Sequence, residues 1–243
     1  MKAFLLAAGL GTRLRPLTDT VPKCLVPIDG RPLLSYWMTL LARHGFDDVV
    51  VNVHHLPEAV RSFAADVQHP RVTLFHEPEL LGSAGTIRAN RAWVAGGEPF
   101  LVAYADDLTN VDLSALMAVH ARHEPLLTMG LFRTPEPTRC GIAELDGGDD
   151  DAVIVGFEEK PAAPKSNLAN AGIYVTDDRV IDWIPDGTAD FGHHVLPRLV
   201  GSMRGHLLRG QLIDVGTWES YRRAQSTAPL LGLEFEVARR GHS

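Results

Sequence analysis

Apolar and polar residues alternate along the first half of the chain in two different periods. The stretches at residues 2–8, 47–55, 71–77 and 99–107 contain short apolar runs, which are typical of strands covered on both faces of a sheet. Between them, residues 31–44, 57–67 and 84–95 carry apolar positions at helical spacing. This order predicts a mostly parallel sheet with helices on both faces, and ligands of such sheets bind beyond the carboxyl ends of the strands.

The second half of the chain is less regular. Four stretches, at residues 126–134, 141–146, 152–160 and 170–176, resemble shorter strands separated by loops rich in Asp, Gly and Pro. Residues 192–203 indicate a helix, residues 205–216 a strand pair, and residues 218–231 a closing helix. We expect these elements to continue the same sheet and to add a small β-rich lobe.

Composition limits the function classes. The 243 residues are 45% hydrophobic and carry a formal net charge of −7, which favours a folded domain and argues against broad binding to nucleic acid or anionic membranes. The first apolar run is too short for a signal peptide or a membrane span. Cys24 and Cys140 lack any metal-ligand spacing. These features predict a cytoplasmic protein with two reduced thiols, and they leave a homo-oligomer open.

The first strand ends in a glycine turn, "AAGLGTRLRP", at residues 7–16. Gly9 and Gly11 permit positive φ and leave room for an anion against the backbone amides. A P-loop requires Gly-Lys-Ser or Gly-Lys-Thr, and Thr12-Arg13 follows here; a dinucleotide fingerprint requires Gly or Ala where Leu14 stands. By itself the turn therefore indicates either a phosphate site or a plain structural turn.

The longer stretch "LAAGLGTRLRPLTDTVPKCLVPI", residues 6–28, resembles the signature of the sugar-1-phosphate nucleotidyltransferases, also called nucleotide-sugar pyrophosphorylases. The resemblance extends over residues 2–225 and implies a Rossmann-like (GT-A-type) α/β fold. It implies that the turn binds the nucleotide and that Arg13 and Lys23 neutralise its phosphates, as nucleotidyl transfer requires. The nucleotide contacts implied for this turn are Ala7, Ala8, Gly9, Gly11, Thr12 and Arg13. Arg15 occupies a variable position and is left as either a ligand or a surface charge.

Two aspartates are candidate metal ligands. Asp106 ends a buried strand, and a carboxylate there serves either as a ligand of a hard cation or as a turn cap. The resemblance favours the ligand, although Ala105 replaces the family's usual glycine. Asp214, in "DVGT", resembles the element that completes the metal site in this family. The resemblance therefore implies Mg²⁺ held by Asp106 and Asp214.

Four further stretches resemble substrate-binding elements of the family. "EKP" and "NAGIY" imply sugar contacts from Glu159 and Asn170 and a phosphate contact from Lys160. Gly141 matches a glycine whose backbone approaches the sugar, with Cys140 in place of the usual tyrosine. "EPELLGSAG" resembles the base-side loop and implies contacts from Glu79, Gly82, Ser83 and Gly85. The N–H groups of a guanine base are hydrogen-bond donors, and the carboxylate of Glu77 or Glu79 could accept hydrogen bonds from them.

These observations predict one nucleotidyltransferase domain over residues 1–243. Its nucleotide-binding half spans about residues 1–130, its sugar-binding half 131–225 and its tail 226–243, with no C-terminal β-helix expected. The predicted reaction joins a nucleoside triphosphate and a sugar 1-phosphate, with Arg13, Lys23, Asp106, Lys160 and Asp214 as catalytic residues. The mannose- or heptose-1-phosphate guanylyltransferase branch, using GTP, is favoured. The alternatives are an enzyme using dTTP, UTP or CTP with a sugar-phosphate or phosphonate acceptor, and a catalytically silent regulatory subunit.

Overall fold

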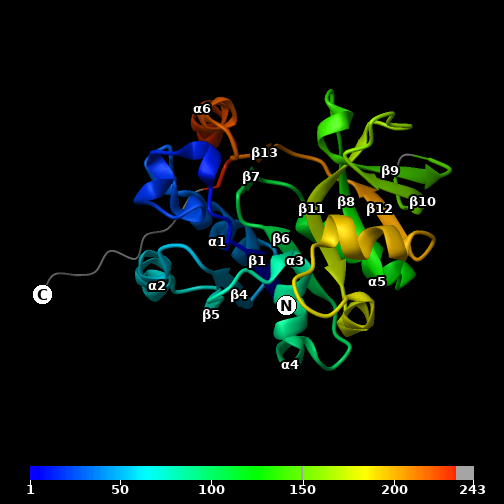
Figure 1. Cartoon of the computed structure of the whole chain (residues 1–243), viewed down its shortest axis with the longest axis horizontal. Coiled ribbons are helices and arrows are strands. Elements are labelled where there is room, and N and C mark those ends of the chain that lie inside the picture. The colour runs from blue at the N-terminus through cyan, green and yellow to red at the C-terminus, as the bar shows by residue number, and fades with distance from the viewer. Residues whose placement is uncertain (149, 234–243) are drawn as a thin grey trace, which may run out of the picture.

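The computed structural model describes residues 1–148 and 150–233. Within these residues, nine strands form one sheet in the order β5-β4-β1-β6-β11-β8-β12-β10-β9 (Figure 1). The strands of this sheet are β1 (Lys2–Leu6), β4 (Asp48–Val53), β5 (Arg71–His76), β6 (Phe100–Tyr104), β8 (Leu127–Arg133), β9 (Gly141–Asp146), β10 (Ala152–Glu159), β11 (Leu168–Thr176) and β12 (Met203–Leu207).

Two smaller pairs and six α-helices complete the regular structure of the described residues. The pairs are β2 (Pro27–Ile28) with β3 (Arg31–Pro32), and β7 (Asp107–Thr109) with β13 (Leu212–Asp214). The helices are α1 (Leu33–Arg43), α2 (Pro57–Asp66), α3 (Gly82–Ala89), α4 (Arg91–Val94), α5 (Leu113–His123) and α6 (Trp218–Thr227).

The strands β1, β4 and β6 are buried on both faces, as their apolar runs predict, whereas β5 lies at the edge of the sheet and none of its residues is fully buried. In β1, Ala3 and Leu5 pack into one core with α1 and α5, while Phe4 and Leu6 pack into a second core with α3 and α4. Alternate residues of a strand point to opposite faces, so one continuous apolar run supplies two cores. The predicted α/β fold is therefore confirmed.

The direction of the strands changes halfway across the sheet. The strands β5, β4, β1 and β6 are parallel. Beyond them, β11 runs antiparallel to β6 and β8, and β10 runs antiparallel to β12 and β9. The sheet is thus parallel in its first half and mixed in its second, where β9 and β10 are consecutive antiparallel neighbours.

The strands of the second half are not shorter than those of the first. In β11, nine residues are interrupted by an irregularity between Asn170 and Tyr174, and β10 shifts register between Ile154 and Gly156. Such register shifts bend a strand without ending its pairing. Of the four predicted stretches, only residues 170–176 fall short of the strand that forms, since β11 begins at Leu168. The expected strand pair at residues 205–216 is also divided, because β12 joins the large sheet and β13 pairs with β7.

The segment expected to be a helix at residues 192–203 forms a single π-helical turn, Phe191–Val195, followed by a 3-10 turn, Leu196–Leu199. Pro197 explains the change, since it cannot donate a backbone hydrogen bond inside an α-helix. The closing helix, α6, is present as expected. Of the predicted tail, residues 234–243 lie outside the described residues, and the described ones contain no β-helix. None of the helices in the described part of the chain has the length and apolar character needed to cross a bilayer.

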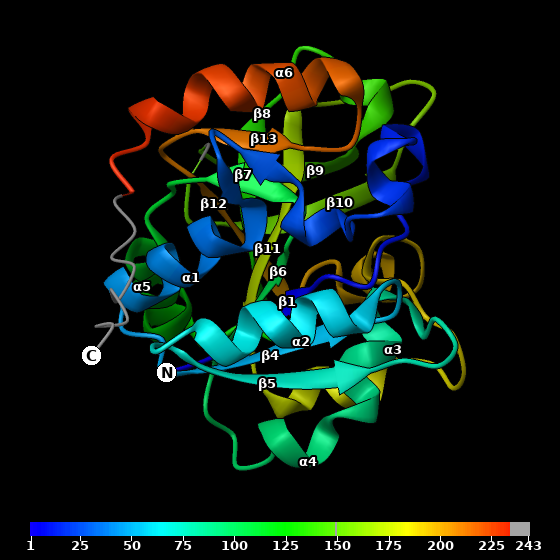
Figure 2. The same cartoon turned by 90° about the vertical axis from the view of Figure 1, so that its left-hand side faces the viewer.

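Chain segments that are distant in sequence meet above the carboxyl ends of the parallel strands. Figures 1 and 2 show α6 beside the turns that follow β1. The indole Nε1 of Trp218 donates to the carbonyl of Arg15 at 3.2 Å, and the Tyr221 hydroxyl donates to the carbonyl of Pro27 at 2.8 Å. The last helix thereby holds the first loop in place.

Gly82 joins the start of α3 to a segment from the second half of the chain. The carbonyl of Ala189 accepts from the amides of Ala84 and Gly85 at 3.0 and 3.1 Å, and the amide of Ala189 donates to Leu81 at 2.9 Å. Gly82 has φ of +76°, and a Cβ there would lie 2.3 Å from the Ala189 carbonyl oxygen. The backbones approach too closely for any side chain.

We predict that Gly82→Ala destabilises the protein more than Gly187→Ala. Both positions have positive φ, but a Cβ at Gly187 meets nothing within 4 Å. Gly187→Ala should cost about 1–2 kcal/mol in free energy of unfolding for the left-handed backbone, and Gly82→Ala a further ~1–3 kcal/mol for the clash. Urea unfolding of both variants measures the difference. Equal losses in the two variants would contradict the close approach.

Candidate active site

A cavity of about 300 Å³ opens beyond the carboxyl ends of β1, β4 and β6. This is the edge of the sheet at which ligands of open α/β folds bind. Seven of the predicted site residues line it, from the turn after β1, the start of α3 and the end of β6: Ala7, Ala8, Gly9, Lys23, Gly82, Ser83 and Asp106.

The turn after β1 is built around Gly11. This residue has φ of +64°, and its carbonyl accepts from the Thr18 hydroxyl at 2.8 Å and from the Leu14 amide at 2.9 Å. A Cβ at Gly11 would lie 2.9 Å from Thr18 Cγ2. Thr12 and Arg13 then start a 3-10 turn with exposed side chains, while Leu14 is buried as its anchor. The turn therefore presents its polar side to the solvent beside the cavity.

Four charged residues meet at the mouth of the cavity. The ammonium of Lys23 contacts Asp106 Oδ2 and lies 3.7 Å from Asp214 Oδ1. The pairing of β7 with β13 places Asp214 opposite Asp107, and the Val215 amide donates to the Asp106 carbonyl at 2.9 Å. A two-stranded sheet of residues about a hundred positions apart thus brings together the two predicted metal ligands.

The charged side chains of this group shift one another's pKa values. Burial opposes the charge on Lys23, but the carboxylates of Asp106 and Asp214 outweigh it and raise the pKa of the ammonium. Burial, followed by repulsion from Asp106, raises the pKa of Asp214. Burial and its two carboxylate neighbours raise the pKa of Asp107 well above its usual range. Negative charge is therefore concentrated here, and it requires a cation as counter-charge.

Arg13 approaches the same group from the glycine turn. A Cβ at Gly216 would lie 2.7 Å from Arg13 Nη2 and 2.8 Å from Asp214 Oδ1. The guanidinium opposes the rise in the pKa of Asp214. Only a glycine at position 216 lets the two side chains come this close.

The four predicted sugar-side residues lie beside the cavity but do not line it. Glu159 faces Gly141 across β10 and β9, and a Cβ at Gly141 would lie 2.6 Å from Glu159 Oε2. Lys160 Nζ lies 3.5 Å from Glu159 Oε1, with the backbone of Lys160 at φ of +51°. Asn170 donates to the Tyr174 hydroxyl at 2.7 Å and accepts from the Gly172 amide at 2.9 Å.

Tyr104 connects the cavity to this sugar-side group. It lines the cavity, and a Cβ at Gly172 would lie 2.6 Å from its ring. Asp190 also lines the cavity, where its Oδ2 accepts from the Ser83 hydroxyl at 2.8 Å. Neither Tyr104 nor Asp190 is among the residues predicted from the sequence. In the sequence, the feature that could have indicated Asp190 is its position directly before Phe191 and Gly192. The feature that could have indicated Tyr104 is its position at the end of a buried strand.

The base-side loop differs from the expectation at its two glutamates. Glu77 is buried and lines the cavity, and both of its carboxylate oxygens accept hydrogen bonds from the protein. Glu79 is exposed and is not among the lining residues. Gly85 packs inside α3, where a Cβ would lie 3.2 Å from Leu81 Cβ. Asn52, from the strand "VVVNV", also lines the cavity; a lone polar residue at the end of an apolar strand was its signal.

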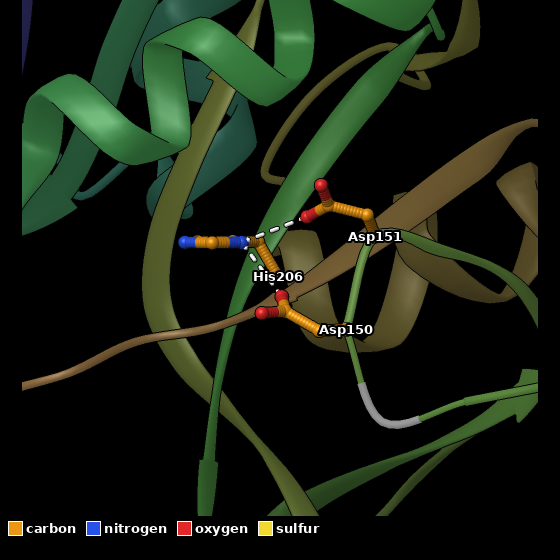
Figure 3. A group of neighbouring side chains, drawn as sticks. All are labelled: Asp150, Asp151 and His206. Atoms are coloured by element: carbon orange, nitrogen blue, oxygen red, sulfur yellow. Dashed lines mark hydrogen bonds and ion pairs between the residues drawn. The ribbon is translucent and has the colours of Figure 1, made fainter.

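A second group of metal-type ligands lies elsewhere in the described residues. Asp150, Asp151 and His206 come within ligand distance of one another, and Figure 3 shows the imidazole between the two carboxylates. His206 Nδ1 lies 2.7 Å from Asp150 Oδ1 and 2.9 Å from Asp151 Oδ1, and Arg122 pairs with Asp151 at 3.2 Å. None of the three residues lines the cavity. The imidazole and the guanidinium already serve as partners for these carboxylates.

Comparison with known proteins gives the family. The sequence profile of the nucleotidyl transferase family, described as "Nucleotidyl transferase", matches residues 2–229. A UTP–glucose-1-phosphate uridylyltransferase from Synechocystis is 35% identical over 83% of this chain and 56% of its own length. A mannose-1-phosphate guanyltransferase from Schizosaccharomyces pombe is 32% identical over 91% of this chain and 62% of its own length. The chain therefore spans about three fifths of the length of these relatives.

Solved structures share the fold. A UDP-glucose pyrophosphorylase from Acinetobacter baumannii superposes with a TM-score of 0.84 at 20% identity, over 96% of this chain and 95% of that one. HddC from Yersinia pseudotuberculosis, complexed with GMP-PN, superposes with a TM-score of 0.77 at 22% identity, over 93% of this chain and 99% of that one. At these identities the likeness establishes the architecture.

We predict that the two thiols differ sharply in reactivity. Burial raises the pKa of Cys24 to about 12, and it also raises the pKa of the half-buried Cys140. At pH 8 only about one Cys24 side chain in ten thousand is a thiolate, the reactive form. In the native protein, an aromatic disulfide reagent should modify Cys140 and leave Cys24 intact, and in denaturant it should modify both. Rapid labelling of the native Cys140→Ser variant would contradict the burial of Cys24.

Proposed function

The chain belongs to the nucleotidyl transferase family, and from that membership we propose that it transfers a nucleoside monophosphate from a nucleoside triphosphate to a sugar 1-phosphate. The observation that carries the proposal is the meeting of Lys23, Asp106 and Asp214 at the mouth of a cavity bordered by the glycine turn. Nucleotidyl transfer requires little covalent chemistry and much charge neutralisation around phosphorus, and these residues supply it.

We assign the two substrates to two halves of one domain. The triphosphate binds the turn at Ala7, Ala8, Gly9, Gly11 and Thr12, and residues 1–130 form the nucleotide half. Residues 131–225 form the sugar half, in which Gly141, Glu159 and Asn170 contact the sugar. Support comes from Tyr104, which lines the cavity together with Ala7, Ala8 and Gly9 and whose ring lies close to Gly172 of the sugar half.

The proposed chemistry is an in-line displacement. An oxygen of the sugar phosphate forms a bond to the α-phosphorus, and the bond from that phosphorus to the bridging oxygen breaks, with its electron pair leaving on pyrophosphate. Lys160 binds the phosphate of the sugar and orients its attacking oxygen. Arg13 and Lys23 neutralise the departing pyrophosphate, and no covalent intermediate on the protein is required.

The donor set at the cavity mouth fits a hard divalent cation. Asp106 and Asp214 both offer carboxylate oxygens toward the same point, where the Lys23 ammonium now supplies the positive charge. Carboxylate oxygens are the ligands that Mg²⁺ prefers. We propose that these two aspartates hold Mg²⁺, which when bound would offset the negative charge of the reacting phosphates.

GTP and a mannose- or heptose-type sugar 1-phosphate are the proposed substrates. A guanylyltransferase among the relatives supports GTP, and a uridylyltransferase supports UTP equally. Because both oxygens of Glu77 already accept hydrogen bonds, the exposed carboxylate of Glu79 is the proposed acceptor for the guanine N–H groups, with Gly82, Ser83 and Gly85 shaping the loop. We place the protein in the cytoplasm and leave its oligomeric state to measurement.

A catalytically silent regulatory subunit is the main alternative from another class. Silent relatives of an enzyme need not retain the residues that act on the phosphates. Here Arg13, Lys23, Asp106 and Asp214 are all present and lie together, which favours an enzyme.

Pyrophosphate release measured across five nucleoside triphosphates and a set of hexose and heptose 1-phosphates tests the proposal. We expect turnover above background for a guanosine or uridine triphosphate paired with one sugar 1-phosphate, and formation of the matching nucleotide sugar. Binding of nucleotides without turnover in any combination would favour the silent alternative.

We predict that Asp106→Asn lowers turnover at least ~100-fold, because it removes a proposed metal ligand and the partner of a buried ammonium. Asp150→Asn is the matched control, since it makes the same change in the other acidic group and should leave turnover within about twofold. Circular dichroism checks that both variants fold. Loss of turnover in Asp150→Asn, with Asp106→Asn active, would move the metal to the group of Asp150, Asp151 and His206.

A further inference from the structure

A closed network of buried polar side chains links the two loops that form the walls of the cavity. Asn52 Oδ1 accepts from the Ala7 amide at 2.5 Å, and Asn52 Nδ2 donates to Glu77 Oε1 at 2.8 Å. Glu77 Oε2 accepts from the Leu81 amide at 3.0 Å. The path runs from the turn after β1, through two side chains, to the residue that precedes Gly82.

The side chains of the network are buried although two of them border the cavity. Asn52 is 4% exposed and Glu77 is 1% exposed. The Thr86 hydroxyl completes the group, donating to Glu77 Oε1 at 2.5 Å and accepting from Asn52 Nδ2 at 3.1 Å. The Glu77 backbone is held as well, through its amide to Val53 at 2.8 Å and its carbonyl to His54 Nδ1 at 2.8 Å.

The polarity of this path restricts which side chains can form it. Both ends are backbone N–H donors, so each end requires an acceptor oxygen. Between the two side chains, one must donate and the other accept. An amide accepts at one end and donates at the other, whereas a carboxylate accepts at both. One amide with one carboxylate satisfies every donor and acceptor along the path. With two amides, an N–H donor faces another N–H donor at one point of the path. With two carboxylates, two negative charges face each other and repel.

We propose that Asn52 and Glu77 are positioning residues that fix the separation of the glycine turn and the base-side loop, and thereby set nucleotide affinity. This inference rests on the proposed function. Both side chains border the cavity, but the network already engages the amide oxygen and nitrogen of Asn52 and both carboxylate oxygens of Glu77, so neither needs to bind the nucleotide directly. The glycine turn and the base-side loop lie at the surface, while the side chains of Asn52 and Glu77 that connect them are buried. If a hydrogen bond between these two side chains is lost, we expect the two loops to move. That movement has to be reversed when a nucleotide binds both walls.

The test exchanges the amide and the carboxylate between the two positions. Asn52→Asp places two carboxylates together, and Glu77→Gln places two amides together. Each single variant should raise the KM for the nucleoside triphosphate by roughly 10- to 100-fold, as expected for one unsatisfied buried group. The KM for the sugar 1-phosphate and kcat should change by less than about threefold. The double variant Asn52→Asp/Glu77→Gln restores one amide and one carboxylate, so its nucleotide KM should return to within about threefold of wild type.

Asn167→Asp is the matched control for the change of charge. Asn167 is exposed, and its Oδ1 accepts from Arg133 Nη1 at 2.9 Å, a role that a carboxylate fills equally well. Its kinetics should match the wild type. A double variant no better than the single variants would overturn the proposal. So would single variants with a lower Tm and an unchanged nucleotide KM, because that result describes a purely structural network.

Calorimetric titration with GTP and UTP separates this inference from the proposed function. If the wild-type protein binds a nucleotide but releases no pyrophosphate, the proposed function fails, and the exchange is then judged on Kd with the same fold-changes. A wild-type protein that turns over normally, with single variants of unchanged affinity, overturns the inference alone. A protein that binds neither nucleotide overturns both.

Discussion

The site depends on the electrostatic balance between one buried lysine and the carboxylates around it. Lys23 is 7% exposed, and an ammonium so poorly hydrated is stable only beside opposite charge. Asp106 and Asp214 supply that charge, and their mutual repulsion is in turn offset by Lys23 and Arg13. Neither sign of charge could be held at this place without the other. The four side chains therefore hold a defined arrangement through their own charges.

The fold supplies this arrangement by joining distant parts of the chain at one edge of the sheet. Asp106 follows directly on β6, whose residues are buried on both faces. Asp214 reaches it only because β13 pairs with β7, and α6 then packs against the turn after β1 (Figure 2). The parallel half of the sheet carries the glycine turn and Asp106, while the mixed half carries Glu159 in β10 and Asn170 in β11.

The walls of the cavity are joined by hydrogen bonds rather than by charge. The path from Ala7 through Asn52 and Glu77 to Leu81 leaves no donor or acceptor of the pair unmatched. Such buried polar networks are specific, because each member has few alternative partners. Glu77 belongs to this link, so a carboxylate that could be expected to read a base instead holds the loop in shape.

The sequence by itself determined the α/β class, the order of the first strands and helices, and the residues of the glycine turn. These follow from local properties: apolar period, glycine at turns and the strong N-terminal motif. It also identified Asp106, Lys23 and Asp214 as candidates, without their distances. Only the tertiary structure decided that the second half of the sheet is mixed, because strand direction depends on which distant segments pair, and β11 pairs antiparallel with both β6 and β8. It alone decided that Glu77 is buried and Glu79 exposed, two residues that the sequence could not distinguish. Burial and partner choice depend on contacts between distant segments, such as Arg15 and Trp218, which are 203 residues apart, and no local pattern records them.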